Sequence, residues 1–567
     1  MRALRHRLIA IFALVIAAMA TPAHAGSECA ATLYTGGTII TMRGESPETV
    51  EAVAVCGGRI IATGTRNETA AAAGEDATVI DLAGRTMLPG FIDAHGHVSG
   101  QGQVAVMAGL AAPPLGTVDS IAALQAALGA YIADNGLPPG APVIGFGYDD
   151  SQLAENRHPT RHDLDAVAAN RPILITHTSG HLAVMNTAML ALAGIKADTP
   201  DPDGGIIRRE ADGRTPDGVL EESAFFRAAA LLQPSDMDRA VDAVVRGERI
   251  YAGYGVTTAQ DGRVTPEAWP ALAEAARRGV LMLDTVVLIA GERQWDAATE
   301  AMVGQPYRDR LRIAGMKLSL DGSPQGRTAW LADPVPVPPP GKDSDYHGYP
   351  AYTPELLDML MAKAAANGWQ VFAHVNGDAA AQALIDGVRS HGLAGRRTIA
   401  IHNQVVTPEQ LAEQAELDIQ PSFFVSHTYF WGDWHREVAL GPKRADFISP
   451  LASGLAAGLT PSIHNDSPVT PPDMMRLIWS AVNRRTQSGD ILGPAERVSP
   501  YAALKMITAN AAWQIHEEGD KGTIETGKRA DLVVLDTNPL TDDPVHLHEI
   551  GIVATIKDGV IIHGSLE

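Results

Sequence analysis

The central part of the chain alternates between short apolar runs and longer segments with helical periodicity, and this alternation constrains the fold more than any other feature. The strand-like runs cover residues 143–146, 172–176, 256–259, 282–288, 315–320, 370–374, 398–402, 418–421 and 460–464. Helical periodicity occurs between several of them, at residues 237–251, 266–278, 354–366, 379–390 and 408–415. Strands that alternate with helices pair in parallel, so the pattern predicts an α/β barrel or an open α/β sheet.

The two ends of the chain have a different sequence pattern, which is typical of β-structure. Residues 31–87 and the residues after 516 contain short strand-like runs separated by glycine-rich or polar turns. We therefore expect one small β-sandwich built from residues 26–87 and 516–567, around a barrel that spans residues 88–515. Residues 102–216, approximately, contain helical pieces and loops that fit the alternation poorly, and they predict an insertion after the first barrel strand.

A histidine pair follows the first strand of the predicted barrel. Pro89 and Gly90 interrupt a strand-like run, and residues 91–97 form a second short run that contains His95 and His97. Because strand side chains alternate, two histidines separated by one residue lie on the same face. Imidazoles spaced in this way can converge on one divalent metal ion. The alternative is that they are two polar residues at a strand end.

Four further candidate ligands lie at the ends of later strand-like runs, and they are Lys317, His374, His402 and Asp466. A lysine within an apolar strand is unusual, because burial of an ammonium group without a partner costs free energy. Each residue alone has a structural alternative: the lysine could reach solvent at the strand rim, and a histidine could cap a loop. Together with the histidine pair, they place six ligand-type side chains at the ends of successive strands.

Several segments resemble the amidohydrolase superfamily. Residues 86–95 and 527–535 are similar to its entry and exit signatures, and the order of the six candidate ligands is similar as well. Three further segments resemble a narrower branch, which includes N-substituted formamide deformylases and many uncharacterised hydrolases. These segments are residues 317–329, 180–188 and 427–434. The resemblance covers nearly all of the chain after the first 30 residues.

The resemblance implies a fold and a metal centre. The fold would be a (β/α)8 TIM-like barrel with a small β-sandwich. His95 and His97 would bind the more buried metal, and His374 and His402 would bind a second metal or a metal and the substrate. Lys317 would be the bridging lysine, carboxylated in members with two metals. The expected cofactor is Zn2+, as one or two ions.

Asp466 would be both a metal ligand and the catalytic residue. A divalent ion lowers the pKa of bound water and polarises the scissile carbonyl group. Asp466 could then take a proton from that water as general base and pass it to the leaving amine. The resemblance therefore predicts a hydrolase of a C–N bond in an amide or N-acyl compound. An ester, lactone or cyclic amide is the near alternative, and an exported barrel that binds a ligand without turnover is a different class.

Three residues are candidate substrate contacts, namely His181, Arg327 and His427. Each histidine could equally be structural, and Arg327 could bind a substrate carboxylate or form an ion pair within its loop. The chain also departs from the branch pattern after its third histidine, before its fourth and after the final aspartate. Those positions hold Val375–Asn376, Ile401 and Ser467. The departures change the expected pocket wall and leave the ligand types unchanged.

The first 25 residues predict a secretory signal peptide. Arg2, Arg5 and Arg7 precede an apolar run at residues 8–20, and Ala23-His24-Ala25 fits a cleavage site. The run is short for a membrane span, although an anchor is the alternative. We expect cleavage after Ala25 and a mature protein in the periplasm or outside the cell.

Charge and cysteine content restrict the partners. With 66 acidic and 44 basic residues, the formal net charge is −22, which argues against nucleic acid or an anionic membrane surface as partner. The expected partner is a small-molecule substrate, and a homodimer is a possible assembly. Cys29 and Cys56 are the two cysteines, and in an oxidising compartment they could form a disulfide or remain buried thiols.

Overall fold

The computed structural model describes residues 29–229, 236–339 and 341–567. The predicted signal peptide at residues 1–25 lies outside the described residues. Among the helices within the described ranges, none combines the length and the apolar character needed to cross a membrane.

Eight parallel strands form the central sheet, in the order β6, β13, β14, β15, β16, β17, β18 and β19. Their bounds are Phe91–Ile92, Val256–Val264, Asp284–Ala290, Leu311–Ser319, Gln370–Val375, Thr398–His402, Ile419–Phe423 and Ser462–Ile463. Nearly every residue in them is buried, as expected for a parallel sheet covered on both faces. Val286 and Leu288 of β14 point into one apolar cluster, whereas Val287 and Ile289 point into another, as strand alternation requires.

The sheet curls into a TIM-barrel-type arrangement, and the loops after its first and last strands meet. The backbone N–H of Asp466, after β19, donates to the carbonyl oxygen of His95, after β6, at 3.1 Å. The N–H of His97 donates to the carbonyl oxygen of Ser467 at 2.8 Å. These two hydrogen bonds join the ends of the sheet at its carboxyl edge.

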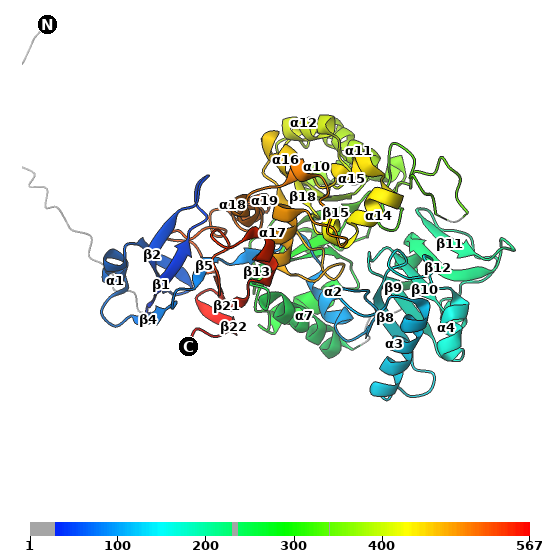
Figure 1. Cartoon of the computed structure of the whole chain (residues 1–567), viewed down its shortest axis with the longest axis horizontal. Helices are drawn as coiled ribbons and strands as arrows, with labels where there is room; N and C mark the ends of the chain where they lie inside the picture. The colour runs from blue at the N-terminus through cyan, green and yellow to red at the C-terminus, as the bar shows by residue number, and fades with distance from the viewer. Residues whose placement is uncertain (1–28, 230–235, 340) are drawn as a thin grey trace, which may run out of the picture.

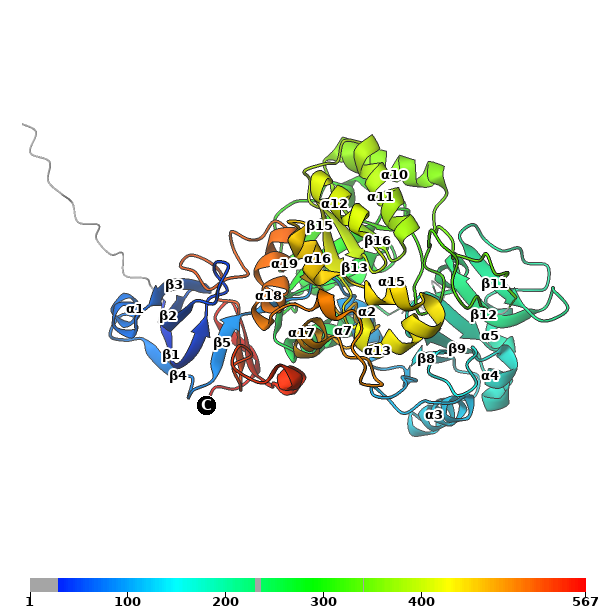
Figure 2. The same ribbon diagram turned by 45° about the horizontal axis from the view of Figure 1, so that its top comes forward.

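Helices connect the strands and cover the outside of the sheet, and α10, α11 and α12 lie together on one side (Figure 2). The helices of this part of the chain are α2 Val98–Val104, α7 Met237–Ala252, α8 Trp269–Arg277, α9 Ala297–Glu300, α10 Pro354–Asn367, α11 Asp378–Ser390, α12 Pro408–Leu417, α16 Leu451–Ala456, α17 Met474–Asn483, α18 Pro500–Met506 and α19 Ala509–Gln514. Helix α10 begins with an N-cap at Thr353 and ends at Gly368, whose left-handed backbone conformation stops the helix.

Strands from both chain ends form a second sheet, which lies at one end of the molecule (Figure 1). They are β1 Thr32–Ile40, β2 Thr49–Cys56, β3 Arg59–Gly64, β4 Thr78–Asp81, β5 Thr86–Pro89, β20 Leu532–Leu535, β21 Ile552–Lys557 and β22 Val560–Gly564. Antiparallel pairing of β5 with β20 joins the two chain ends. Their hydrogen bonds describe one sheet, so the division into two sandwich layers stays a prediction. Helix α1 Arg66–Ala73 packs on this sheet, and a disulfide joins Cys29 to Cys56.

Between β6 and β13 the chain forms a third sheet of six strands, at the opposite end of the molecule from the terminal sheet (Figure 1). Its strands are β7 Ala108–Gly109, β8 Val143–Tyr148, β9 Ile173–His177, β10 Leu182–Met185, β11 Gly205–Arg209 and β12 Pro216–Glu222. Its helices are α3 Ile121–Asp134, α4 Arg161–Ala168, α5 Thr187–Leu192 and α6 Ser223–Ala229. We call this part the inserted sheet.

The inserted sheet shows where two of the strand-like runs belong. The runs at residues 143–146 and 172–176 lie within the predicted insertion and become β8 and β9 of this sheet. A buried parallel strand has the same apolar composition in any sheet, so the local sequence does not indicate which sheet the strand joins. The predicted insertion, at about residues 102–216, covers most of the sheet, and β12 continues past that limit to Glu222.

Loops and short helices lie beside the carboxyl edge of the barrel. The short helices are α13 His427–Phe430, α14 Gly432–Trp434, the π-helix η2 His435–Ala439, α15 Pro442–Asp446 and the 3-10 helix η3 Pro494–Glu496, and a second 3-10 helix, η4 Pro544–Glu549, packs on α17. The described residues of 332–353 contain no helix or strand, as expected for a loop rich in proline and glycine.

A buried ion network joins the barrel to the terminal sheet. Asp284, at the start of β14, accepts from Lys557 of β21 and lies 2.7 Å from the ammonium groups of both Lys557 and Lys521. Lys557 also contacts Asp531 at 2.7 Å. Burial would raise the pKa of Asp284, but the two lysines outweigh it and hold that pKa well below its usual range.

Candidate metal centre

The six predicted ligands come from different strands and meet at one edge of the barrel. Lys317 lies on β15 and His374 on β16, while His402 is the last residue of β17. The other three, His95, His97 and Asp466, lie in the loops after β6 and β19. Because the carboxyl ends of parallel strands share one edge, the barrel brings these side chains together.

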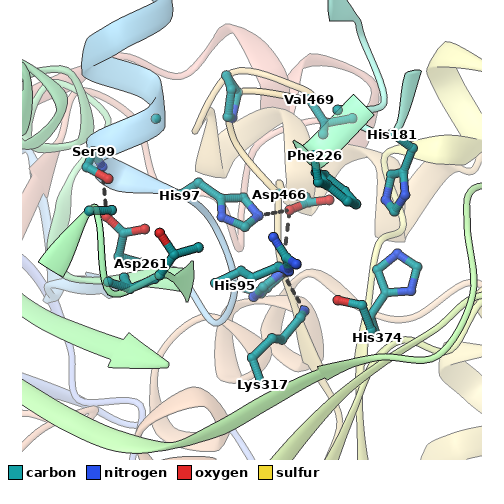
Figure 3. A pocket seen from close by; sticks show the side chains of 18 of the residues that line it. His95, His97, Ser99, His181, Phe226, Asp261, Lys317, His374, Asp466 and Val469 are labelled. Carbon is teal, nitrogen blue, oxygen red and sulfur yellow. Dashed lines mark hydrogen bonds and ion pairs between the residues drawn. The ribbon is translucent and has the colours of Figure 1, made fainter. Parts of the chain in front are cut away.

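Asp466 lies at the middle of the group (Figure 3). Its Oδ1 is 3.2 Å from His97 Nε2 and 3.4 Å from His95 Nε2, and its Oδ2 is 3.9 Å from His402 Nε2. Lys317 Nζ lies 3.2 Å from His95 Nε2. We call His95, His97 and Asp466 the barrel trio.

The barrel trio fits a bound metal ion. Ligand atoms at about 2.0–2.2 Å from a tetrahedral zinc ion lie about 3.3–3.6 Å from one another. The separations of 3.2 and 3.4 Å around Asp466 are close to that range. Asp466 Oδ1 is also buried without a hydrogen-bond partner. The side chains therefore converge in the manner that a divalent ion requires.

Electrostatics keep the ligands in the form that binds metal. Burial, together with neighbouring cationic groups, holds the pKa of His95, His374 and His402 well below the usual value, so the imidazoles stay neutral. Burial alone would raise the pKa of Asp466, but His97 and its other neighbours outweigh that effect and lower it. Burial lowers the pKa of Lys317 to about 7, with Arg263 adding to the effect.

Buried polar partners orient the histidines. His374 Nδ1 lies 3.1 Å from Asp321 Oδ1, and His402 Nδ1 lies 3.0 Å from His464 Nε2. Such contacts fix the ring orientation of a metal ligand. Asn376 Nδ2 also lies 3.3 Å from His374 Nε2, so this amide competes for the nitrogen that faces the centre.

The backbone is strained at two of the candidate ligands. His402 and Asp466 have φ angles of 69° and 52°, in the left-handed region that non-glycine residues rarely adopt. Strain of this kind persists where the surrounding structure enforces it, and it gathers at functional sites.

The predicted substrate contacts occupy different places. His181 lies beside His374 (Figure 3), and the centroids of the two rings are 5.0 Å apart. Its Nδ1 is 2.7 Å from Glu222 Oε2. Burial alone would lower the pKa of His181, but Glu222 outweighs that effect and raises it. His427 lines a small inner cavity next to His374.

Arg327 is not among the residues that line the cavities beside the metal centre. Its guanidinium lies 3.9 Å from Asp150 Oδ2 and over the ring of Trp434. It also donates to the carbonyl oxygens of Val337 and Pro338, at 3.3 and 3.5 Å. The placement matches the alternative of an ion-paired loop arginine and gives no support to binding of a substrate carboxylate.

A cavity of about 350 Å³ leads from the metal centre towards solvent. Its wall is mixed: the apolar residues are Phe146, Phe225, Phe226, Val264, Ala268, Pro468 and Val469, and polar or charged residues such as Gln103, Glu267 and Arg293 lie among them. Arg263 also lines the cavity, stacks over Phe226 at 4.6 Å and forms an ion pair with Glu292. The sequence interpretation assigned no role to Arg263, Phe226, Asp321 or His464. Asp321 and His464 lie close in sequence to Lys317 and Asp466, whereas only the fold brings Arg263 and Phe226 to the cavity.

A profile described as the amidohydrolase family matches residues 78–563 of the chain. The chain belongs to this family. Over 533 residues it is 30% identical to an N-substituted formamide deformylase of Arthrobacter pascens, covering 90% of this chain and 94% of that protein. Over 548 residues it is 31% identical to the putative amidohydrolase YtcJ of Bacillus subtilis (strain 168), covering 94% of this chain and 99% of that protein.

Solved structures support the same architecture. An uncharacterised metal-dependent hydrolase from Pyrococcus horikoshii superposes with a TM-score of 0.73 at 24% identity, over 91% of this chain and 99% of that chain. A second such hydrolase, from Pyrococcus furiosus, superposes with a TM-score of 0.70 at 26% identity, over 90% and 100% of the two chains. The family fold therefore extends over nearly all of the described residues.

Proposed function

We propose that this member of the amidohydrolase family is an exported, metal-dependent hydrolase that cleaves the C–N bond of an amide or N-acyl compound. The observation that carries the proposal is the convergence of the barrel trio with Lys317, His374 and His402 in a cavity whose wall includes three phenylalanine side chains. The identity to an N-substituted formamide deformylase supports the same bond class.

The chain's own residues would supply the proton transfers. A divalent ion, with Zn2+ as the expected one, would lower the pKa of water and polarise the substrate carbonyl group when bound. His95, His97 and Asp466 would hold it. Asp466, ionised because its pKa is lowered, would accept a proton from the attacking water at Oδ1 or Oδ2 and deliver it to the leaving nitrogen. His181, protonated beside Glu222, would donate to the carbonyl oxygen.

Lys317 would be carboxylated. With a pKa of about 7, a large fraction of its amine is neutral near neutral pH, and a neutral amine can attack carbon dioxide. The new N–C bond gives a carbamate, and one proton leaves to solvent. The carbamate is anionic and has two oxygens, so it could bridge two metal ions, with His374 and His402 binding the second ion.

The shape of the cavity indicates how a substrate would lie. The inner cavity beside His427 is only about 10 Å³, whereas the outer cavity is about 350 Å³ and has phenylalanine side chains in its wall. A small acyl group would fit at the inner end, and a larger, apolar N-substituent would fit outside. Esters, lactones and cyclic amides are the alternative substrates, because the same groups can attack their carbonyl carbon.

A substrate panel tests the proposal. The metal-replete enzyme should release amine from N-benzylformamide faster than from the matching acetamide, and faster than it hydrolyses the matching ester or a cyclic amide. Faster hydrolysis of the ester or a lactone would show that the enzyme cleaves C–O bonds instead of C–N bonds. If the protein contained its full complement of metal and hydrolysed no compound on the panel, a ligand-binding protein would be favoured.

The N-terminal sequence of protein from the secreting host tests export. It should begin at Gly26, and retention of Met1 would refute cleavage.

A further inference from the structure

A second group of metal-binding side chains lies in the inserted sheet, outside the barrel. Asp149 and Asp150 follow β8 directly, and His177 is the last residue of the parallel neighbour β9. His177 Nε2 is 3.2 Å from Asp150 Oδ1 and 3.6 Å from Asp149 Oδ1. The three residues are 0–4% exposed. We call them the inserted-sheet trio.

The atoms of this trio converge on a common point. None of the contacts between His177 Nε2 and the two carboxylates has the geometry of a hydrogen bond, and both His177 Nε2 and Asp150 Oδ1 are buried without a hydrogen-bond partner. Unsatisfied buried polar atoms are costly, so such a pair calls for a missing partner. The barrel trio has the same signature, with separations of 3.2 and 3.4 Å and an unpartnered Asp466 Oδ1.

We propose that Asp149, Asp150 and His177 bind a structural divalent metal ion of the zinc type. The separations of 3.2 and 3.6 Å are close to the edge of a zinc tetrahedron, about 3.3–3.6 Å. Two carboxylates also balance the charge of a divalent ion.

Neighbouring groups hold the ligands in place, as outer partners do in metal sites. Trp431 Nε1 donates to Asp149 Oδ2 at 2.6 Å, on the side of the carboxylate away from His177. Ser151 donates to Asp149 Oδ1 from its backbone N–H and its hydroxyl, so a bound ion would share that oxygen with Ser151. The Ser179 hydroxyl lies 2.8 Å from His177 Nδ1, where it can accept the proton of that nitrogen and leave Nε2 for the ion.

A proton is the competing occupant of Nε2. The backbone N–H of Ser179 donates to His177 Nδ1 at 3.1 Å, which favours a proton on Nε2, and the two carboxylates raise the pKa of His177 to about 9 against the effect of burial. Arg327, 3.9 Å from Asp150, supplies positive charge as well. An Nε2–H group should, however, point at a carboxylate oxygen, and here it makes no such hydrogen bond.

The ion would connect the inserted sheet to the barrel loops. On the barrel side, the inserted-sheet trio contacts Trp431, in the segment after β18, and Arg327, in the segment after β15. On the cavity side, His181 is only four residues after His177 in the chain. Thr178 also donates to the carbonyl oxygen of Val469, in the loop after β19. A metal ion here would therefore stiffen the segment that presents His181 to the cavity, without contacting the substrate.

Anomalous diffraction from crystals of the mature chain soaked in Zn2+ tests the proposal directly. We expect a zinc peak between the three side chains, with the barrel trio as an internal control. A barrel peak with no peak at the inserted-sheet trio would overturn the proposal. A peak at the inserted-sheet trio alone would support the structural site and would count against the proposed metal centre of the barrel.

Metal content gives a second test that does not depend on activity. His177→Gln and Asp150→Asn should each contain one ion fewer per chain than the wild type, and should melt at a lower temperature. His162→Gln, a mostly exposed histidine in the same part of the chain, is the matched control and should keep the full content. Folded His177→Gln protein with wild-type metal content would refute the site, and if that variant does not fold, the anomalous map of the wild type decides.

Discussion

The barrel trio and the inserted-sheet trio contain the same kinds of donor, but their surroundings differ. The barrel trio lies at the end of a cavity of about 350 Å³, which leaves room for water and a substrate. In the inserted-sheet trio, Asp149 borders only a pocket of about 30 Å³. Catalytic metal sites keep an open position, whereas structural sites are closed. From this difference in access, we expect the barrel trio to support chemistry and the inserted-sheet trio to have a structural role.

Charge separates the two trios as well. Arg327 lies beside the inserted-sheet trio, and its guanidinium stays charged at any pH that a protein tolerates. The cationic side chain beside the barrel trio is Lys317, whose pKa of about 7 allows it to become neutral and react. A permanent cation suits a fixed network, while a titrating amine suits a centre whose ligand can be modified.

Loss of both histidines of the barrel trio should have the largest effect. His95→Ala combined with His97→Ala removes two nitrogen ligands from the same face of one segment, so hydrolysis should fall to background. Metal content should decrease by the barrel ions only, with the ion of the inserted-sheet trio retained. Activity assays and elemental analysis check this, and a double variant with full metal content and rate would place the catalytic centre elsewhere.

Removal of the proposed general base, Asp466, should cause the second-largest loss of activity. Asp466→Asn keeps the shape of the side chain but cannot accept the proton, so kcat should fall on the order of a hundred- to ten-thousand-fold. The fold and much of the metal should remain. The matched change in the other trio, Asp150→Asn, should lower the melting temperature with little change in kcat. Wild-type turnover in Asp466→Asn would remove this residue from the mechanism.

Lys317→Ala tests the bridging carbamate. The variant should lose the second barrel ion and most of its activity, because the anionic bridge between the ions is gone. Acetate or propionate should restore part of the rate by supplying a carboxylate in the vacated space. A crystal grown with bicarbonate and excess metal that shows an unmodified Lys317 amine with one ion would contradict the two-metal centre.

Substitution of Arg327 tests whether this residue contributes to stability, to substrate binding or to both. Arg327→Met should destabilise the protein, because it removes one of the buried cationic groups that face Asp150. KM should not depend on whether the substrate carries a carboxylate, since the arginine lies outside the cavity wall. Thermal unfolding and paired substrates with and without a carboxylate measure both effects, and a selective rise in KM for the acid would restore the substrate-binding hypothesis.

Glu248 is a buried carboxylate outside both trios, and its substitution should have the smallest effect of those considered, limited to the pH dependence of stability. It accepts hydrogen bonds from the Met282 N–H and the Thr285 hydroxyl, and burial raises its pKa to about 7. The unfolded chain loses this proton near its ordinary pKa of 4.5, so the folded state binds more protons between pH 4.5 and 7. The stability contributed by protonated Glu248 is therefore lost as pH rises through this window.

Glu248→Gln should remove that dependence. The drop in melting temperature between pH 5 and pH 8 should be smaller in the variant than in the wild type. An equal drop in both proteins would show that Glu248 does not titrate in this range.

The comparison also shows how far sequence interpretation reaches. Helices predicted at residues 354–366, 379–390 and 408–415 agree with α10, α11 and α12 to within two residues, because caps and prolines mark their ends locally. The predicted helix at residues 266–278 begins later, at Trp269. The family, recognised from short motifs, was confirmed by the comparisons, whereas the residue roles stay predictions.

The sequence by itself determined that the six candidate barrel ligands lie together, because consecutive parallel strands place their carboxyl ends at one edge of the sheet. Only the tertiary structure decided that β8 and β9 join a separate sheet, that Arg327 faces Asp150, and that Asp149, Asp150 and His177 converge. These contacts join segments that no local periodicity relates, because the choice of sheet and the approach of loops depend on long-range packing.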